Sequence, residues 1–295
     1  MSEQDWLAQR FEEHRHRLRA VAYRMLGSVN EAEDAVQEAW LRLSGSEPGE
    51  IENLSGWLTT VVARVSLNML RSRAVRREEP LSPHLPDPIV DRADGVDPEH
   101  EALLADSVGL ALLVVLETLT PPERLAFVLH DMFGVRFEEI AELLGRSPQA
   151  ARQLASRARR RVRAQPTTPD VDVSAQREVV NAFLAAAREG DFDALVATLD
   201  PDVVVRADGG AAPAASIEVR GALNVARRVV MWPSVDLALY PALVNGAAGV
   251  VATRDGVVFT IVAIIVRNGK IAEMDFLADP ERLARLDLTG LDGRG

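Results

Sequence analysis

The stretch that decides the fold runs from Gly145 to Arg163 and reads Gly-Arg-Ser-Pro-Gln-Ala-Ala-Arg-Gln-Leu-Ala-Ser-Arg-Ala-Arg-Arg-Arg-Val-Arg. It opens with a Gly-Arg turn. Ser147 is then a suitable helix N-cap, and Pro148 suits the first helical position, where its missing N–H costs nothing. Apolar residues recur at helical spacing, at Ala151, Leu154, Ala155, Ala158 and Val162. The pattern predicts a helix with one buried side.

The opposite side of this helix is polar and cationic. Its members are Gln149, Arg152, Gln153, Ser156 and Arg160, and no acidic residue interrupts the run. Another amphipathic helix, over 137–144, precedes the tight turn, and the pair has the pattern of a helix-turn-helix. Arg and Gln read base edges in the major groove, and flanking arginines contact phosphates. The alternative is a solvated basic helix in an ordinary bundle, but the residue pattern favours DNA recognition.

The composition indicates several domains and no thiol chemistry. The 295 residues are 47% hydrophobic, which is enough for two or three separate cores. The absence of cysteine excludes disulfides, thiolate metal sites and a cysteine nucleophile. Charged residues interrupt the N-terminus where a signal peptide would be apolar, and the most apolar stretch, 257–266, is too short to span a bilayer. We therefore expect a cytoplasmic protein with no membrane partner.

The net charge of −11 is unusual for a protein that binds DNA by itself. Neutralising phosphates normally requires an excess of Lys and Arg. Positive charge is instead concentrated in 71–77 and 146–163. We therefore expect the chain to meet DNA while a larger assembly holds it there.

The N-terminal residues predict two amphipathic helices, over 5–27 and 31–43, with Ser28 and Glu31 as a capping box between them. The outer face of the second helix carries Asp34, Gln37, Glu38 and Leu41. An exposed leucine within an acidic patch suits docking to a basic partner. A solvated helix face is the alternative, and spacing alone favours it.

A third helix is expected to begin at Trp57, after a loop over 44–56. Its outer face carries Trp57, Thr60, Arg64, Asn68 and Arg71. An aromatic residue followed by evenly spaced polar and basic groups suits single-stranded or melted nucleic acid, through stacking and phosphate contacts. Trp57 also fits a core position near a helix start, and the pattern does not decide between the two.

Five prolines make 78–98 a linker, which contains Leu85-Pro86-Asp87-Pro88. A helix over 99–118 follows, and Thr120 with Glu123 makes a capping box for the next one. Pro166 and Pro169 mark another boundary.

The pattern after that boundary is typical of a small α+β domain. Helices are expected at 174–189, 191–199, 221–231 and 279–283, and strands at 202–207, 235–245, 248–253, 257–267 and 270–277. Asn-Gly and Asp-Gly pairs join the last four strands as hairpins, and Asp208 to Pro213 forms a turn.

Residues 1–165 resemble a bacterial RNA polymerase sigma factor of the extracytoplasmic-function (ECF) group. Glu31 to Glu38 is similar to the polymerase-binding helix of that family, Trp57 to Arg77 to its −10 element reader, and Phe137 to Arg163 to its −35 element reader. Residues 174–278 resemble a SnoaL-like cone, the fold of polyketide cyclases and ketosteroid isomerases. The fusion of the two resembles the subgroup that carries its own regulatory C-terminal domain and includes the sigma-J proteins.

The resemblance implies a multidomain fold, in which two all-α helical domains precede an α+β SnoaL-like cone. Sigma region 2 is expected over 1–78, a linker over 79–98, sigma region 4 over 99–165, and the regulatory cone with its tail over 174–295.

The resemblance also assigns functional residues. Polymerase binding falls to Glu33, Asp34, Gln37, Glu38 and Leu41. The −10 element falls to Asn53, Trp57, Thr60, Arg64, Asn68, Arg71 and Arg73. The −35 element falls to Ser147, Gln149, Ala150, Arg152, Gln153, Ser156, Arg157 and Arg160. No catalytic residue, cofactor or metal is implied.

Three further motifs of the subgroup are present in altered form. Its Trp-Leu-Pro-Glu-Pro linker motif appears as His84-Leu85-Pro86-Asp87-Pro88, without the Trp. Its Asp-Gly-Gly-Gly motif appears as Asp208-Gly209-Gly210-Ala211, and its Asn-Pro-Asp-Lys-Leu motif as Asp279-Pro280-Glu281-Arg282-Leu283. Regulatory contacts are therefore predicted at Leu85, Pro86, Asp87, Pro88, Asp208, Gly209, Gly210, Asp279 and Pro280.

These observations favour a promoter-specificity subunit whose partners are core RNA polymerase and promoter DNA, and whose activity its own C-terminal domain modulates. A one-component regulator, with a cone that senses a small ligand, would leave the motifs of 31–77 unused. An enzyme in the cone would need a carboxylate or histidine base and an oxyanion donor. No histidine follows His130. Asp208, Asp255 and Asp275 remain as candidate acids, but Asp208 and Asp255 precede glycine and are better explained as turn residues, so we expect no enzyme activity. Whether the cone binds a small ligand stays open.

Overall fold

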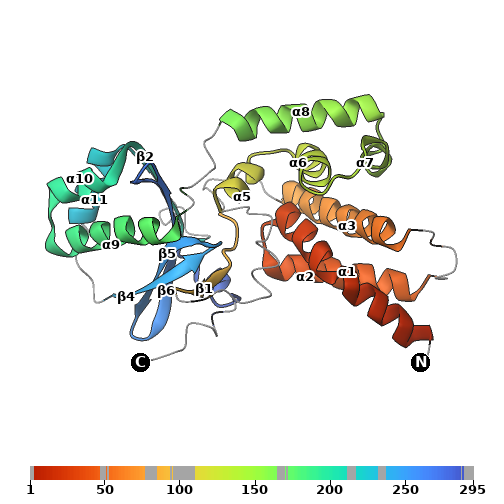
Figure 1. The fold of residues 1–295 in the computed structure, drawn as a ribbon, viewed down its shortest axis with the longest axis horizontal. Helices are drawn as coiled ribbons and strands as arrows, with labels where there is room; N and C mark the ends of the chain where they lie inside the picture. Colours follow the sequence, from red (N-terminus) through yellow and green to blue (C-terminus); the bar gives the residue numbers. More distant parts are fainter. Residues whose placement is uncertain are drawn as a thin grey trace. The chain divides into compact units, whose positions relative to one another are not determined.

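The computed structural model describes residues 3–46, 51, 53–76, 85–93, 95, 110–164, 170, 172–210, 217–231, 237–286 and 288 (Figure 1). They belong to two compact units. The first comprises Met1–Glu79, Pro98–Asp106 and Leu112–Thr167, and the second Pro80–Asp97, Ser107–Ala111 and Thr168–Gly295. Some predicted features lie outside the described residues, namely the helix over 99–109, Arg77, His84, the boundary prolines and the turn at 211–213.

The first unit begins with three helices that pack on one another, α1 (Glu3–Leu26), α2 (Val29–Ser44) and α3 (Leu54–Arg76). α3 begins three residues before the predicted start at Trp57, because the Asn53 side chain caps it and accepts the Gly56 N–H at 3.0 Å. Ser28 caps α2 as predicted. The Glu31 carboxylate, however, accepts from Arg73 Nε at 3.2 Å, so a charged partner replaces the second half of the expected capping box.

The second half of the first unit is also helical, with α5 (Leu110–Glu117), α6 (Pro121–Phe127), a π-helical turn η2 (Val128–Met132), α7 (Phe137–Leu144) and α8 (Pro148–Ala164). Gly145 ends α7 in the left-handed conformation with φ +62°, which costs little because glycine lacks a Cβ. Ser147 Oγ then accepts the Ala150 N–H at 3.2 Å and caps α8. The predicted helix-turn-helix is confirmed.

Two buried arginines join these two helical parts. Arg124 of α6 donates from Nε to the Arg24 carbonyl at 3.0 Å and from Nη1 to Glu117 Oε1 at 2.8 Å. The Arg24 guanidinium lies 5.3 Å from the centre of the Phe133 ring, and Arg17 donates to the Phe133 carbonyl at 3.1 Å. Because a buried charge is tolerated only when it is paired or hydrogen-bonded, these contacts define a specific packing within the first unit.

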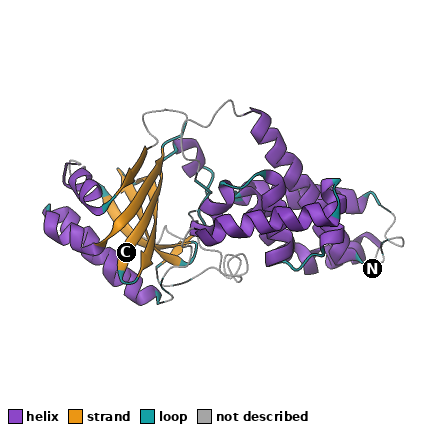
Figure 2. Ribbon diagram, turned by 90° about the horizontal axis from the view of Figure 1, so that it is seen from above, coloured by secondary structure: helices purple, strands orange, loops and turns teal. Residues whose placement is uncertain are grey.

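The second unit is the predicted α+β domain (Figure 2). Its helices are α9 (Val173–Glu189), α10 (Phe192–Thr198), α11 (Ala222–Met231) and α12 (Pro280–Leu283). Its strands are β1 (Val90–Arg92), β2 (Leu199–Asp208), β3 (Ile217–Arg220), β4 (Ala238–Val244), β5 (Ala247–Arg254), β6 (Val257–Arg267) and β7 (Lys270–Leu277). The bounds of β6 and β7 agree with the predicted strands, whereas β1 and β3 were not predicted.

The strands form one sheet in the order β1-β4-β5-β6-β7-β2-β3. Neighbours are antiparallel except β2 and β7, which are parallel. Asn245, Asp255 and Asn268 have positive φ and each precedes a glycine, which confirms the three predicted hairpin turns. β1 pairs antiparallel with β4, with Val90 opposite Val244, so part of the predicted linker forms an edge strand of this sheet.

Helices α9, α10 and α11 cover one face of the sheet. Apolar side chains fill the space between them, among them Val180, Phe183, Leu195, Leu199, Val203, Val225, Val250, Val262, Ile264 and Met274. Burying such side chains is the main source of stability for a domain of this size.

Candidate nucleic-acid interface

The outer face of α8 is exposed as predicted. Ala151, Leu154, Ala155 and Ala158 are buried and Val162 is half-buried. The predicted −35 residues Ser147, Gln149, Arg152, Gln153, Ser156, Arg157 and Arg160 are exposed, and Ala150 is half-buried. One face of α8 therefore exposes polar and cationic side chains that are accessible to a nucleic acid.

Glu123 of α6 forms ion pairs with two arginines of α8 that could otherwise contact DNA phosphates. Its carboxylate lies 3.3 Å from Arg157 and 2.8 Å from Arg161, and it also accepts from the Thr120 hydroxyl at 2.8 Å. The predicted capping box at Thr120 is present. Burial works to raise the pKa of Glu123, but the hydrogen bonds from Thr120 and the two arginines outweigh it and lower this pKa. Arg157 and Arg161 are thus partly neutralised within the protein.

The predicted polymerase-binding face of α2 is mostly solvent-exposed. Asp34 and Gln37 are exposed, and Leu41 retains 58% of its accessible surface. Glu38 is half-buried and pairs with Arg42 at 2.9 Å. Glu33 turns toward α1, where it pairs with Arg15 at 3.2 Å, so it contributes to packing of the two helices.

The predicted −10 residues on α3 divide into two groups. Arg64, Asn68 and Arg71 are exposed, whereas Trp57 and Thr60 are half-buried. Arg73 donates to the Leu26 carbonyl at 3.0 Å and to Glu31, and so ties α3 to the turn between α1 and α2. The structure therefore gives Arg73 a structural role that the sequence pattern did not indicate.

The start of α3 lines a cavity of about 270 Å³. Its lining comes from the start of α3, from the segment between η2 and α7, from α7 and from α1, and includes Asn53, Ser55, Gly56, Thr59, Thr60, Phe133, Gly134, Val135, Arg136, Glu139, Leu143 and Arg17. Two predicted −10 residues, Asn53 and Thr60, thus face the segment that leads into the helix-turn-helix.

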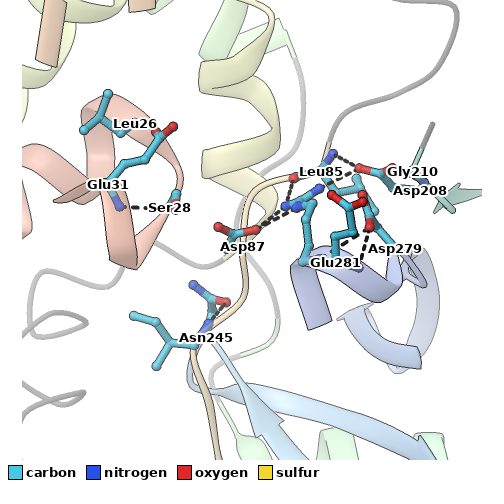
Figure 3. A network of polar contacts seen from close by, with 12 residues as sticks. Leu26, Ser28, Glu31, Leu85, Asp87, Asp208, Gly210, Asn245, Asp279 and Glu281 are labelled. Carbon is cyan, nitrogen blue, oxygen red and sulfur yellow. Dashed lines mark hydrogen bonds and ion pairs between the residues drawn. The ribbon is translucent and has the colours of Figure 1, made fainter. Parts of the chain in front are cut away.

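In the second unit, the linker residues Leu85 to Arg92 lie against the cone (Figure 3). The Leu85 N–H donates to Asp208 Oδ2 at 3.1 Å. Ile89 and Asn245 exchange two hydrogen bonds, of 3.1 Å to the Asn245 side chain and 2.8 Å from its N–H. Leu85, Ile89 and Val90 are buried, so both apolar and polar contacts fix the segment.

Arg282 of α12 connects the three altered motifs. It donates from Nε to Asp87 at 2.8 Å, from Nη1 to Asp208 at 2.7 Å, and from Nη2 to the Leu85 carbonyl at 2.6 Å. The side chains of Asp87 and Arg282 are each 14% exposed, and that of Asp208 is 7% exposed. We call Leu85, Asp87, Asp208 and Arg282 the linker dock.

A glycine is required beside the linker dock. Gly210 has φ +81°, and a Cβ there would lie 2.7 Å from the Asp279 carboxyl group. That carboxyl caps α12 by accepting the Glu281 N–H at 2.9 Å. The predicted residues Leu85, Asp87, Asp208, Gly210 and Asp279 thus come together, whereas Arg282 and Asn245 were missed as contact residues. The only signal for Arg282 was its basic position in the tail motif.

Comparison with known proteins agrees with these features. The family model for sigma-70 region 2 matches residues 10–76, and that for sigma-70 region 4 matches 109–162. The ECF RNA polymerase sigma factor SigJ of Mycobacterium tuberculosis is 44% identical over 92% of this chain and 91% of its own. The probable ECF sigma factor SigI of the same species is 35% identical over 96% of this chain and 97% of its own. The crystal structure of SigJ superposes with a TM-score of 0.74, covering 94% of this chain and 98% of that one at 39% identity.

The fold and the two helical regions therefore define a sigma factor. The chain belongs to the extracytoplasmic-function RNA polymerase sigma factors, which confirms the expected family and the fold of two helical regions followed by an α+β domain. It is a transcription initiation factor that binds RNA polymerase and promoter DNA. Within the described ranges, none of the helices combines the length and the hydropathy needed to cross a bilayer.

Proposed function

We propose that this sigma factor contacts core polymerase through the outer face of α2. Asp34, Gln37 and Leu41 are exposed on one side, and Glu38 borders them. An exposed leucine surrounded by acidic groups is complementary to a basic surface with an apolar centre. Glu33 supports this face through its pairing with α1.

The −10 element is contacted from α3 and the −35 element from α8. Arg64, Asn68 and Arg71 supply phosphate and base contacts on α3, while Trp57 offers a half-buried stacking surface. Asn53 and Thr60 line the cavity at the start of α3 and extend this surface. Arg152 and Gln153 read base edges near the start of α8, and Arg160 contacts phosphate.

The linker dock modulates the activity by limiting how far the two readers can separate once the packing of the two helical parts on one another opens. α3 ends at Arg76 and α5 begins at Leu110, and the chain between them is held on the cone at Leu85–Arg92. A promoter sets the separation of its elements, so holding or releasing the dock changes which separations the factor can accept.

The observation that carries this proposal is the bonding of Arg282 to all three partners of the linker dock. Replacing Arg282 by Ala leaves the carboxylates of Asp87 and Asp208 close together without their shared cation. Like charges in a nearly buried site repel one another, and unpaired buried charges are costly, so the linker should detach.

The test uses the full chain with core polymerase on a cognate promoter. Arg282→Ala should raise run-off transcription severalfold and speed amide exchange at Leu85 and Ile89. Arg285→Ala, an exposed change three residues on, should alter neither. Fast exchange at Leu85 with unchanged transcription would contradict modulation by the dock.

We infer further that the cone acts without catalysis, in the cytoplasm where transcription takes place. The three candidate acids have other roles: Asp208 belongs to the dock, Asp255 lies in a hairpin turn, and Asp275 pairs with Arg206 at 2.7 Å. Among the described residues, mainly apolar side chains line the space between helices and sheet, and the buried Gln176 amide there already accepts the Ala248 N–H, which does not favour a small polar ligand. Transcription that depends on an added metabolite would count against this inference.

A further inference from the structure

Arg152, the proposed base reader of α8, is held in place by α7. Its Nη2 lies 3.0 Å from Glu138 Oε1, and its guanidinium carbon lies 5.4 Å from the centre of the Phe137 ring. Glu138 and Phe137 are the first residues of α7, whereas Arg152 lies in the second turn of α8. The contact therefore spans the two helices of the helix-turn-helix.

The Phe137 ring is in turn held by a second aromatic residue, His130. It stacks on the His130 ring with centroids 3.8 Å apart and planes inclined by 29°. His130 Nδ1 in turn lies 3.0 Å from the Val135 carbonyl, across the loop that precedes α7. Imidazole, phenyl and guanidinium groups thus form a series that ends at the exposed surface of α8.

We propose that Glu138 is a positioning residue that, together with Phe137, sets the orientation in which Arg152 reads a base. A free arginine loses rotamer entropy when it is fixed on DNA, and it reaches phosphates as readily as bases. Nη2 carries two N–H groups, so one can remain on Glu138 while the other and those of Nη1 face outward. The parallel donors of an arginine match the O6 and N7 acceptors of guanine, which is the base we expect opposite Arg152.

This inference rests on the proposed role of Arg152, and the experiment separates the two. Full-length protein bound to core polymerase competes for promoter fragments in which each −35 base pair is replaced in turn. Arg152→Ala should relax the preference at one base pair. Glu138→Gln should reduce discrimination at that same pair about two- to fivefold, as expected when an exposed ion pair is lost while the Phe137 contact remains.

Two further variants exclude a merely structural role. In the double variant of Arg152→Ala and Glu138→Gln, discrimination should fall no further than in Arg152→Ala alone, because Glu138 acts through Arg152. Glu142→Gln removes the same charge from an exposed residue one turn further along α7, and it should leave every preference unchanged.

The outcomes are distinct. If Arg152→Ala relaxes one position and Glu138→Gln does not, the positioning role is wrong and the reading role stands. If Glu138→Gln lowers affinity equally for all fragments, or adds to Arg152→Ala in the double variant, its effect is structural and the inference falls. If Arg152→Ala relaxes no position, both proposals are wrong.

Discussion

Glu123 and Arg282 illustrate how single charged side chains organise each unit. Each is nearly buried and each satisfies partners from several segments, which is the condition under which a buried charge contributes to a specific structure. Glu123 joins the start of α6 to two arginines of α8, and Arg282 joins α12 to β2 and the linker. Both positions are open to tests by conservative substitution.

Glu123→Gln should destabilise the region 4 helices at neutral pH by about 1–2 kcal/mol, because it weakens a capping box and two ion pairs. The folded state lowers the pKa of Glu123, so its contribution is present above the ordinary value of 4.5 and is lost as the pH falls through the lower folded-state pKa. Amide exchange in α6 and α8 should therefore differ between the two proteins from pH 7 to 5. The difference should vanish in more acidic solution, and a constant difference would contradict the assignment.

Arg160 is predicted to contact phosphate. Arg160→Ala should weaken binding to all promoter fragments by a similar factor and reduce the slope of log K against log salt by about one. The same titration on Arg159→Ala should show a smaller change in slope, because Arg159 is already paired with Asp131 at 2.6 Å. A loss restricted to one base variant in Arg160→Ala would identify it as a base reader instead.

At the scale of elements, the sequence predicts well what is encoded locally. Helical periodicity located α1, α2 and α9, and Asn-Gly and Asp-Gly pairs located the hairpins of β4 to β7, because those signals lie within the segments themselves. β1 was missed because its partner β4 lies about 150 residues away and its own stretch is short and follows prolines. The start of α3 was placed too late because the capping function of Asn53 depends on side-chain geometry.

The same distinction holds for the candidate site. The outer faces of α2, α3 and α8 follow from spacing, since a helix fixes which residues share a side. The resemblance to known motifs supplied Asp87, Asp208 and Asp279 as contacts. Arg282, Glu138 and Glu123 could not be predicted as partners, because each contacts a residue of another element and the packing of the elements decides which side chains meet.

The outer face of α2 can be tested as an element. Replacing both Asp34 and Glu38 by Lys should weaken binding to core polymerase at least tenfold, because the new charges oppose a basic partner surface. The helix itself should lose only a few tenths of a kcal/mol, from the new repulsion between position 38 and Arg42.

The matched control changes the same charge elsewhere. Glu12 and Glu13 are exposed on α1, and replacing both by Lys alters the net charge equally. This control should keep core affinity within about twofold, as for surface changes outside an interface. Equal loss in both double variants would show that net charge, and not the α2 surface, governs polymerase binding.

At the scale of the whole molecule, the net charge of −11 and the separate basic faces fit a factor that reaches DNA as part of a larger enzyme. The linker, which is docked on the cone, connects the chain of the −10 reader to that of the −35 reader and therefore restrains both. Intramolecular attachment makes even a weak contact effective, and a few kcal/mol suffice to shift the population between docked and released linker.

Removing the tail from Asp279 onward tests this tether most directly. The shortened chain lacks Arg282 and the cap of α12, so the linker should leave the cone while β6 and β7 keep their pairing. Amide exchange in β6 and β7 checks that the cone stays folded, and core affinity is measured for both proteins.

The decisive measurement is run-off transcription by full-length protein and the 1–278 chain on promoters whose −35 and −10 elements are moved apart base pair by base pair. Each added pair shifts the elements by about 3.4 Å. The linker dock predicts a higher output from 1–278 on the cognate promoter and a broader range of accepted spacings. Equal output and identical spacing profiles, at equal core affinity, would contradict the account.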